Sequence, residues 1–150
     1  MIFVTGGAGF IGANFVLDWF LQRQETIVNI DKLTYAGNLE SLSSLKKDSR
    51  HIFIQGDIRD QSLIDELLEK YHPRAILNFA AESHVDRSIH GPEAFIQTNV
   101  VGTFYLLESV RSYWNKLDEK AKIDFRFLQV STDEVYGSLG KVEPAFIETH

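Results

Sequence analysis

Four glycines near the start of the chain are spaced as in a turn that binds phosphate. The residues fit G-x-G-x-x-G at Gly7, Gly9 and Gly12, and also G-x-x-G-x-x-G when Gly6 is the first glycine. Such glycines permit a sharp turn, leave room for phosphates, and let the next helix lie close to the sheet with its N-terminus facing a pyrophosphate. Because the same triplet also occurs in turns without a ligand, the flanking residues must decide between the two interpretations.

An acidic residue follows the glycines at the distance typical of dinucleotide sites. Asp31 comes 19 residues after Gly12, at the end of the apolar run 27–30, where an acid is expected to bind the ribose hydroxyls of an adenosine. Since a carboxylate repels a 2′-phosphate, the sequence predicts NAD in preference to NADP. The neighbouring Lys32 argues the other way, because a cation there could accept that phosphate.

Two further polar segments follow apolar runs. Asp57 and Ile58 come after the run 52–55, where a carboxylate and an apolar neighbour could hold the edge and the face of an adenine; the alternative is an ordinary turn aspartate. The segment 80–88, AAESHVDRS, begins with small residues and ends with a dense polar set. We expect it to face the cofactor and substrate, the alternative being a solvated loop.

Thr132, Asp133 and Glu134 place a hydroxyl and two adjacent carboxylates after the apolar run 125–130. Repulsion between neighbouring carboxylates favours protonation of one of them, which would supply one acid and one base. That division of roles suits an elimination of water. The alternative is that these residues only form the N-cap of a helix.

A parallel sheet would bring these segments together. Five apolar runs predict strands within one domain of residues 1–150, with helical patterns between them: 2–4, 27–30, 52–55, 75–79 and 125–130. The nearly continuous apolar run at 75–79 indicates a strand that is covered on both faces. With right-handed crossovers this gives a Rossmann-like doubly wound α/β fold of strand order 3-2-1-4-5, whose ligand lies beyond the carboxyl ends of the strands.

Helical spacing also predicts which side chains face the sheet. The first helix should bury Ile11, Phe15, Val16, Trp19 and Phe20. The helix after Asp60, its expected N-cap, should bury Leu63, Ile64, Leu67, Leu68 and Tyr71. A long helix from Pro92 to about Leu117 should bury Phe95, Ile96, Val100, Phe104, Leu107, Val110 and Trp114.

Three details refine this prediction. Asn38 is a plausible N-cap for a helix with leucines at 39, 42 and 45. Asn99, Gly102 and Thr103 are poor helix formers in the middle of the long helix, so this turn should approach another element closely or lend a polar group to the site. The charged segment 116–122 is expected to be a solvated connection.

Composition excludes several other functions. A net charge of −6 disfavours nucleic acid and anionic membranes as partners, and neither a membrane-spanning run nor a signal peptide is expected. The absence of cysteine excludes disulfides and thiolate metal sites, which fits a cytoplasmic protein. None of the five histidines pairs with another at i, i+4, so no metal site is expected, and no G-x-S-x-G elbow supports a serine hydrolase.

Four stretches of the chain resemble the amino-terminal part of the dTDP-glucose 4,6-dehydratases, a group within the extended short-chain dehydrogenase/reductase family. They are residues 5–12, 31–38 (DKLTYAGN), 80–89 (AAESHVDRSI) and 131–137 (STDEVYG). The first stretch is common to the superfamily, whereas the other three are more specific. Related sugar-nucleotide epimerases tend to carry a serine-rich segment without an acidic pair where this chain has Thr132, Asp133 and Glu134.

The resemblance implies a full set of site residues. With the glycine turn, the cofactor set for NAD is Gly6, Gly7, Gly9, Phe10, Ile11, Gly12, Asp31, Lys32, Leu33, Thr34, Asp57, Ile58, Phe79, Ala80, Ala81, Glu82, Ser83 and Thr98. Ser83 and Thr132 are implied to contact the sugar. Glu134 is implied to take the C5 proton, and Asp133 to protonate the departing C6 hydroxyl.

The implied reaction is NAD-dependent dehydration of dTDP-glucose, or a similar nucleotide sugar, to its 4-keto-6-deoxy product for rhamnose-type biosynthesis. It consists of oxidation at C4, elimination of water across C5 and C6, and return of the hydride to C6. The resemblance also implies a homodimer for the full-length protein, with the helix from Pro92 at its interface. The alternatives are a sugar-nucleotide 4-epimerase, another sugar-nucleotide dehydratase, or a protein that binds a dinucleotide without catalysis.

The chain departs from the family pattern in one respect. The family's catalytic tyrosine lies in a Y-x-x-x-K pair, and no such pair occurs in these 150 residues. We therefore expect an amino-terminal portion of an NAD-binding domain, truncated before the substrate-binding lobe and inactive on its own.

Overall fold

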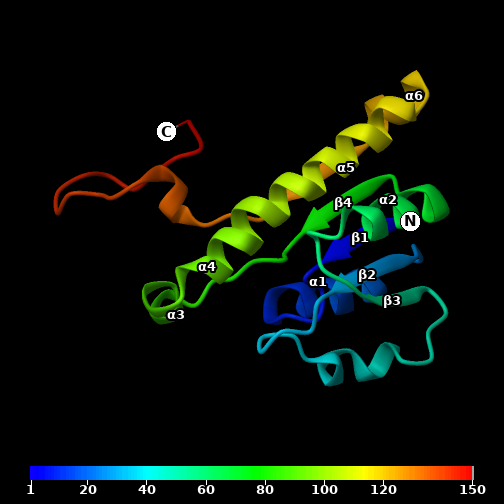
Figure 1. Cartoon of the computed structure of the whole chain (residues 1–150), viewed down its shortest axis with the longest axis horizontal. Helices are drawn as coiled ribbons and strands as arrows, with labels where there is room; N and C mark the ends of the chain where they lie inside the picture. The colour runs from blue at the N-terminus through cyan, green and yellow to red at the C-terminus, as the bar shows by residue number, and fades with distance from the viewer. Residues whose placement is uncertain (150) are drawn as a thin grey trace.

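Five parallel strands form a single sheet in the order β3-β2-β1-β4-β5 (Figure 1). The computed structural model describes residues 1–149, without the side chain of Asp133. The strands are β1 (Ile2–Thr5), β2 (Ile27–Asp31), β3 (His51–Gln55), β4 (Ala75–Asn78) and β5 (Arg126–Gln129). The predicted strand order and the Rossmann-like doubly wound class are thus confirmed.

Helical segments connect the strands. The α-helices are α1 (Phe10–Gln22), α2 (Gln61–Tyr71), α3 (Val85–His90), α4 (Pro92–Phe95), α5 (Thr103–Lys116) and α6 (Glu119–Asp124). Two short 3₁₀ segments are η1 (Leu39–Leu45) and η3 (Asp133–Tyr136), and η2 (Ile96–Gly102) is a π-helix that joins α4 to α5.

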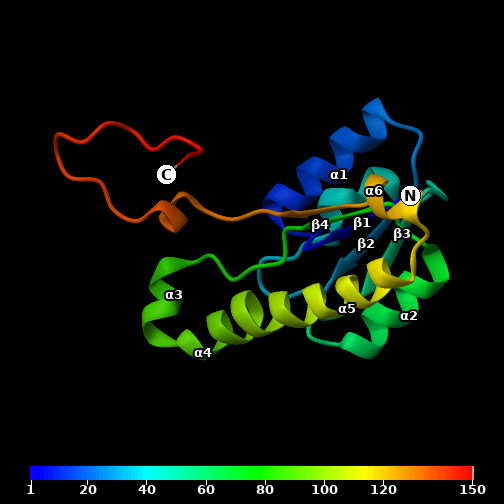
Figure 2. The same cartoon turned by 90° about the horizontal axis from the view of Figure 1, so that it is seen from above.

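Both faces of the sheet are covered, because successive strand residues point to opposite sides. Ile2 and Val4 pack with α1 and η1 on one face, whereas Phe3 packs with α2 and α5 on the other. Figure 2 shows the sheet between α1 and the pair formed by α2 and α5. The central strands are therefore buried on both sides, as expected for a parallel sheet.

The predicted apolar face of the long helix is wrong for most of its residues, although Val110 is buried as predicted. Helical backbone does run from Pro92 to Lys116, but Ile96, Val100, Phe104, Leu107 and Trp114 are all exposed. The buried stripe is instead Gly102, Leu106, Ser109, Val110 and Tyr113. Both stripes have helical spacing, and the second faces inward because Gly102 lets the helix lie close to the segment after β3: a Cβ there would lie 2.8 Å from Ile58 Cδ1.

Other local predictions had mixed outcomes. Asn38 and Asp60 cap η1 and α2 as predicted, by accepting hydrogen bonds from the N–H groups of Glu40 and Leu63. Ile11 is exposed rather than buried, since it lies in the first, outward-facing turn of α1.

Two segments that were expected to be irregular contain short helices. In the polar segment after β4, α3 begins at Val85, and the connection after α5 contains α6. The Asp118 side chain caps α6 by accepting from the N–H of Ala121. None of the helices in the part of the chain that the structure describes is long and apolar enough to cross a membrane.

The corrected helix face makes a direct prediction about stability. Leu106 is 1% exposed in the core between α5 and the sheet, so Leu106→Ala should lower the free energy of unfolding by about 2–5 kcal/mol. Leu21, on α1, is 86% exposed, and Leu21→Ala should change it by less than about 0.5 kcal/mol. Urea denaturation of both variants provides the measurement, and equal losses would contradict the assigned face.

Candidate functional site

The glycine turn joins β1 to α1, and the space around its glycines differs. Gly6 has a left-handed φ of 70°, and a Cβ there would lie 2.5 Å from the backbone N of Ala80, so this turn also fixes the start of the loop after β4. Gly12 presses α1 against the turn, because its Cβ would overlap the carbonyl oxygen of Gly6. At Gly9 a Cβ would make one tight contact, 3.3 Å from that oxygen, and would meet no other atom within 4 Å, so the remaining space beside the turn is open.

The N-terminus of α1 faces this open space. Gly9 is the N-cap and supplies no capping side chain, and the first N–H groups of a helix have no partner within it. Phe10 and Ile11 are largely exposed at this end. The arrangement offers backbone N–H donors and the positive end of a helix dipole to an anion.

The Asp31 carboxylate holds the turn and the next loop together. One oxygen accepts from the N–H of Ala8 at 2.9 Å, and the other from the N–H of Leu33 at 2.8 Å, where Leu33 itself has a left-handed φ of 57°. The N–H of Asn38 in turn donates to the carbonyl of Ala8 at 2.8 Å. Each carboxylate oxygen can accept a further hydrogen bond, so Asp31 is both a structural link and an available acceptor.

An ion-pair cluster lies beside Asp31. Lys32 Nζ is 2.9 Å and Arg59 Nη2 is 2.8 Å from the same oxygen of Asp57. Burial alone would raise the pKa of the Asp57 carboxyl, but the hydrogen bonds from Arg59 and Lys32 outweigh burial and hold that pKa well below its ordinary value. Asp57 is therefore ionised at neutral pH, and the positive charge of Lys32 is already engaged.

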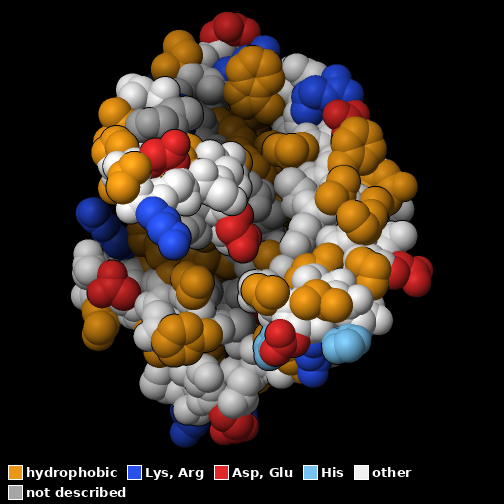
Figure 3. Space-filling view, turned by 90° about the vertical axis from the view of Figure 1, so that its left-hand side faces the viewer, with side chains coloured by type: hydrophobic (Ala, Val, Ile, Leu, Met, Phe, Trp, Pro, Cys, Tyr) orange, Lys and Arg blue, Asp and Glu red, His pale blue; other side chains and the backbone are white. Residues whose placement is uncertain are grey.

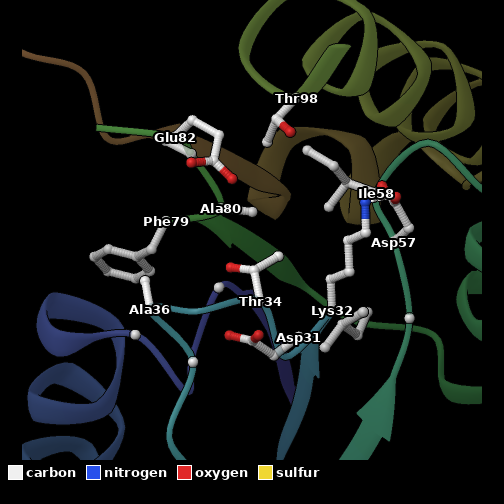
Figure 4. Close-up of a pocket in the computed structure, with 16 residues that line it drawn as sticks. Asp31, Lys32, Thr34, Ala36, Asp57, Ile58, Phe79, Ala80, Glu82 and Thr98 are labelled. Atoms are coloured by element: carbon white, nitrogen blue, oxygen red, sulfur yellow. Dashed lines mark ion pairs between the residues drawn. The ribbon is translucent and has the colours of Figure 1, made fainter. Parts of the chain in front are cut away.

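One cavity of about 570 Å³ collects most of the predicted cofactor residues (Figure 4). It is lined by Gly6, Gly9, Asp31, Lys32, Thr34, Asp57, Ile58, Phe79, Ala80, Ala81, Glu82 and Thr98 from the predicted set. The predicted residues that do not line it are Gly7, Phe10, Ile11, Gly12, Leu33 and Ser83. Sequence reasoning missed Ile30, Ala36, Gly37 and Gly56, which the rule that ligands lie at strand carboxyl ends could have identified.

A second hollow of about 1160 Å³ adjoins the first and shares Ala80, Ala81 and Glu82 with it. It brings together Ser83, Thr132 and Glu134, which come from the ends of β4 and β5. The Thr132 hydroxyl donates to Glu134 at 3.1 Å. The Asp133 side chain lies outside what the structure describes. Figure 3 faces the end of the molecule with α3, α4 and the segment after β5, and shows apolar side chains around a hollow.

Polar side chains join the ends of three strands, where Thr5 and Asn78 are buried and Gln129 is exposed. Thr5 donates to Asn78 Oδ1, and Asn78 Nδ2 donates to Gln129 at 2.8 Å. These three residues are direct neighbours in the strand register, so the bonds run straight across β1, β4 and β5. The signal in the sequence is a polar residue at the end of each of these three apolar strands.

The loop after β4 is fixed on both sides. Asn99 accepts from the N–H of Glu82 and donates to its carbonyl, each at 2.8 Å, which confirms the expectation that this helical turn lends a polar group. Tyr35 donates to the Glu82 carboxylate at 3.0 Å, and Arg87 lies 3.6 Å above the Tyr35 ring. Desolvation and the Glu82 carboxylate raise the pKa of the Tyr35 hydroxyl.

Among the described side chains of residues 1–149, no group of three or more His, Cys, Asp or Glu is placed to hold a metal ion.

The sheet order and the glycine turn after the first strand define the class of protein: a Rossmann-like, doubly wound α/β domain. The chain belongs to the family whose model is described as GDP-mannose 4,6 dehydratase, which matches residues 3–150.

Individual relatives agree with the resemblance expected from the sequence. The chain is 62% identical over 138 residues to the dTDP-glucose 4,6-dehydratase of Xanthomonas campestris pv. campestris, a match that covers 92% of this chain and 39% of the relative. The chain thus spans about two fifths of the length of that relative.

Solved structures share the fold. The crystal structure of dTDP-glucose 4,6-dehydratase from Bacillus anthracis in complex with NAD matches with a TM-score of 0.80 and 41% identity, over 99% of this chain and 43% of that one. UDP-glucose 4-epimerase from Thermotoga maritima, solved with UDP-glucose, matches with a TM-score of 0.77 and 28% identity, over 96% of this chain and 42% of that one.

The glycine geometry predicts unequal effects of adding a methyl group. Gly6→Ala forces an L-residue into a left-handed conformation and against the Ala80 backbone, and should lower the free energy of unfolding by more than about 1–2 kcal/mol. Gly9→Ala is the matched control, with extended backbone and a single contact at 3.3 Å, and should cost less than about 1 kcal/mol. Equal denaturant midpoints for the two variants would contradict this assignment.

Proposed function

We propose that residues 1–150 are the NAD-binding part of an NAD-dependent dTDP-glucose 4,6-dehydratase, which forms dTDP-4-keto-6-deoxy-glucose for rhamnose-type nucleotide-sugar biosynthesis. Because the chain spans about two fifths of a dehydratase relative, the activity is proposed for the complete enzyme that includes these residues. The observation that carries the proposal is that the cavity at the glycine turn and the hollow at Thr132 and Glu134 share one wall, formed by Ala80, Ala81 and Glu82.

The residues of the first cavity fit NAD. The open space at Gly9 would admit the pyrophosphate beside the N–H groups of α1, and Asp31 would accept from the adenosine ribose hydroxyls. Asp57, Ile58 and Thr98 would line the adenine end. When bound, NAD would supply the acceptor and donor of hydride for a reaction in the adjoining hollow.

Residues of the second hollow would bind the sugar and move protons. Ser83 would donate a hydrogen bond to a sugar oxygen, and the Thr132 oxygen would accept one from a sugar hydroxyl. The Glu134 carboxylate would take the proton from C5, which a ketone at C4 makes acidic. The proposed role of Asp133 is to protonate the departing C6 hydroxyl. The hydrogen bond from Thr132 to Glu134 supports this assignment, because it would orient the base toward the hollow.

The alternative activities differ in what they need from this hollow. A sugar-nucleotide 4-epimerase shares the fold, as the match to the Thermotoga maritima enzyme illustrates, but its reaction eliminates no water and needs no acid–base pair at C5 and C6. Another sugar-nucleotide dehydratase would use the same pair on a different donor. A protein that only binds a dinucleotide would use the first cavity alone. The 62% identity to a dTDP-glucose 4,6-dehydratase favours the first proposal.

The role proposed for Glu134 predicts a selective defect in the complete enzyme. Glu134→Gln should leave oxidation at C4 intact but slow elimination by about 10²–10⁴-fold, since the base for the C5 proton is lost. After rapid mixing with dTDP-glucose, reduced nicotinamide should accumulate together with a 4-keto sugar that retains its C6 oxygen.

Absorbance measures the reduced nicotinamide, and mass spectrometry of the product measures the 4-keto sugar. Glu119→Gln is the control, because Glu119 lies on α6 and pairs only with Lys122 among the contacts described. Release of dehydrated product by Glu134→Gln at the parent rate would remove Glu134 from the mechanism, and formation of a galactose epimer by the parent would favour the epimerase.

We also propose that the protein is a homodimer, as the resemblance implies, and that it lies in the cytoplasm and binds neither nucleic acid nor membranes, as its composition predicts. The support for a dimer is the apolar stripe of Ile96, Val100, Phe104 and Leu107, whose members are 43–58% exposed on the side of η2 and α5 that faces away from the sheet. Such side chains at helical spacing suit pairing with the same surface of a second copy.

A charge in the middle of this stripe should prevent pairing. Phe104→Glu should convert the enzyme to a monomer in light-scattering measurements, because an unpaired carboxylate would be buried at the interface. Leu21→Glu introduces the same charge at an equally apolar but isolated position that is 86% exposed on α1, and should leave the mass unchanged. A dimer that persists in Phe104→Glu would place the interface elsewhere.

A further inference from the structure

The cavity that we assign to NAD is lined by a cation next to Asp31, and this bears on selectivity between NAD and NADP; the inference rests on the proposed function. Lys32 directly follows Asp31, the residue proposed to hold the ribose hydroxyls. Among the described side chains that line this cavity, Lys32 is the only lysine or arginine. A 2′-phosphate is attracted to such a cation, so the presence of Lys32 alone would favour NADP.

In the structure the ammonium group of Lys32 pairs with Asp57. The Lys32 side chain runs across the cavity wall to Asp57, where its Nζ lies 2.9 Å from Oδ2 (Figure 4). The Lys32 side chain is 49% exposed, and it therefore has the room and the rotatable bonds to turn toward a phosphate if its partner were neutral.

Hydrogen bonds from Arg59 favour the ionised form of the Asp57 carboxyl. Its carboxyl is 22% exposed and accepts from Arg59 Nε at 3.0 Å and Nη2 at 2.8 Å on one oxygen, and from the Arg59 N–H at 3.0 Å on the other. These bonds fix the carboxylate in place at the edge of the cavity, and they occupy the guanidinium of the second nearby cation. One carboxylate thus engages both positive side chains near Asp31.

We propose that Asp57 determines the selectivity of the site for NAD over NADP by holding Lys32 away from the ribose 2′ position. The Asp31 carboxylate would then repel a 2′-phosphate, and the charge of Lys32 would not offset this repulsion because it is paired with Asp57. Asp57 acts through Lys32, and it is a specificity-determining residue in addition to any contact that it makes with adenine.

The test compares dissociation constants for NAD and NADP, measured by calorimetric titration of the complete enzyme. Asp57→Asn keeps the size of the side chain but frees Lys32, and should lower the ratio of the NADP constant to the NAD constant by about tenfold, as expected for one new charge-assisted hydrogen bond. Adding Lys32→Met to this variant should return the ratio to the parent value.

Two single variants serve as controls. Asp60→Asn removes an equal charge three residues away while keeping a good N-cap for α2, and should leave the ratio within about twofold. Lys32→Met alone should also leave it within about twofold, because the charge of Lys32 is already engaged. This second variant keeps the proposal testable even if Asp57→Asn fails to fold.

Several results would overturn the proposal. They are an unchanged ratio in Asp57→Asn, a lowered ratio that persists in the double variant, or a large change in NADP binding by Lys32→Met alone. If the parent binds neither nucleotide, the proposed cofactor itself fails, and the selectivity proposal fails with it. If the parent binds NAD and only the ratios disagree, the proposed function stands and Asp57 has no role in selectivity.

Discussion

The hydrogen bonds accepted by Asp31 are the constraint on which the site depends. Its two carboxylate oxygens bind the N–H groups of Ala8 in the glycine turn and of Leu33 in the following loop. Without them the turn, the left-handed conformation of Leu33 and the position of Lys32 would each be set independently. Because Asp31 is buried at the end of a central strand, these bonds transmit the rigidity of the sheet to the loops around the cavity.

A second set of bonds extends this order toward the hollow proposed for the sugar. Thr5, Asn78 and Gln129 join the ends of three adjacent strands, and Asn99 fixes the backbone of Glu82 just beyond them. The segment of residues 80–82, which the two hollows share, therefore follows strand ends that are joined by side chains, and it is also bonded to Asn99 in η2. Such a wall could keep a cofactor and a sugar in a fixed relation, which hydride transfer requires.

Much of this fold could be predicted from the sequence, because the apolar runs and the glycine turn are local signals. Strand order, two helix caps and the polar role of Asn99 are confirmed. The buried face of α5 could not be predicted, since two stripes have the same period and the choice depends on how closely Gly102 approaches Ile58. The ion pair between Lys32 and Asp57 could not be predicted either, because it joins the segments after two strands through side chains whose directions only the folded chain defines.

The central claim is that the turn at Gly6–Gly12 and Asp31 form a site for NAD, and the dissociation constant of NAD for Asp31→Ala tests it most directly. Loss of the acceptor for the ribose hydroxyls should raise this constant by about one to two orders of magnitude. The comparison needs Asp18→Ala, which removes an exposed carboxylate from α1, and a check by circular dichroism that the turn still folds. An unchanged constant in folded Asp31→Ala would contradict the account.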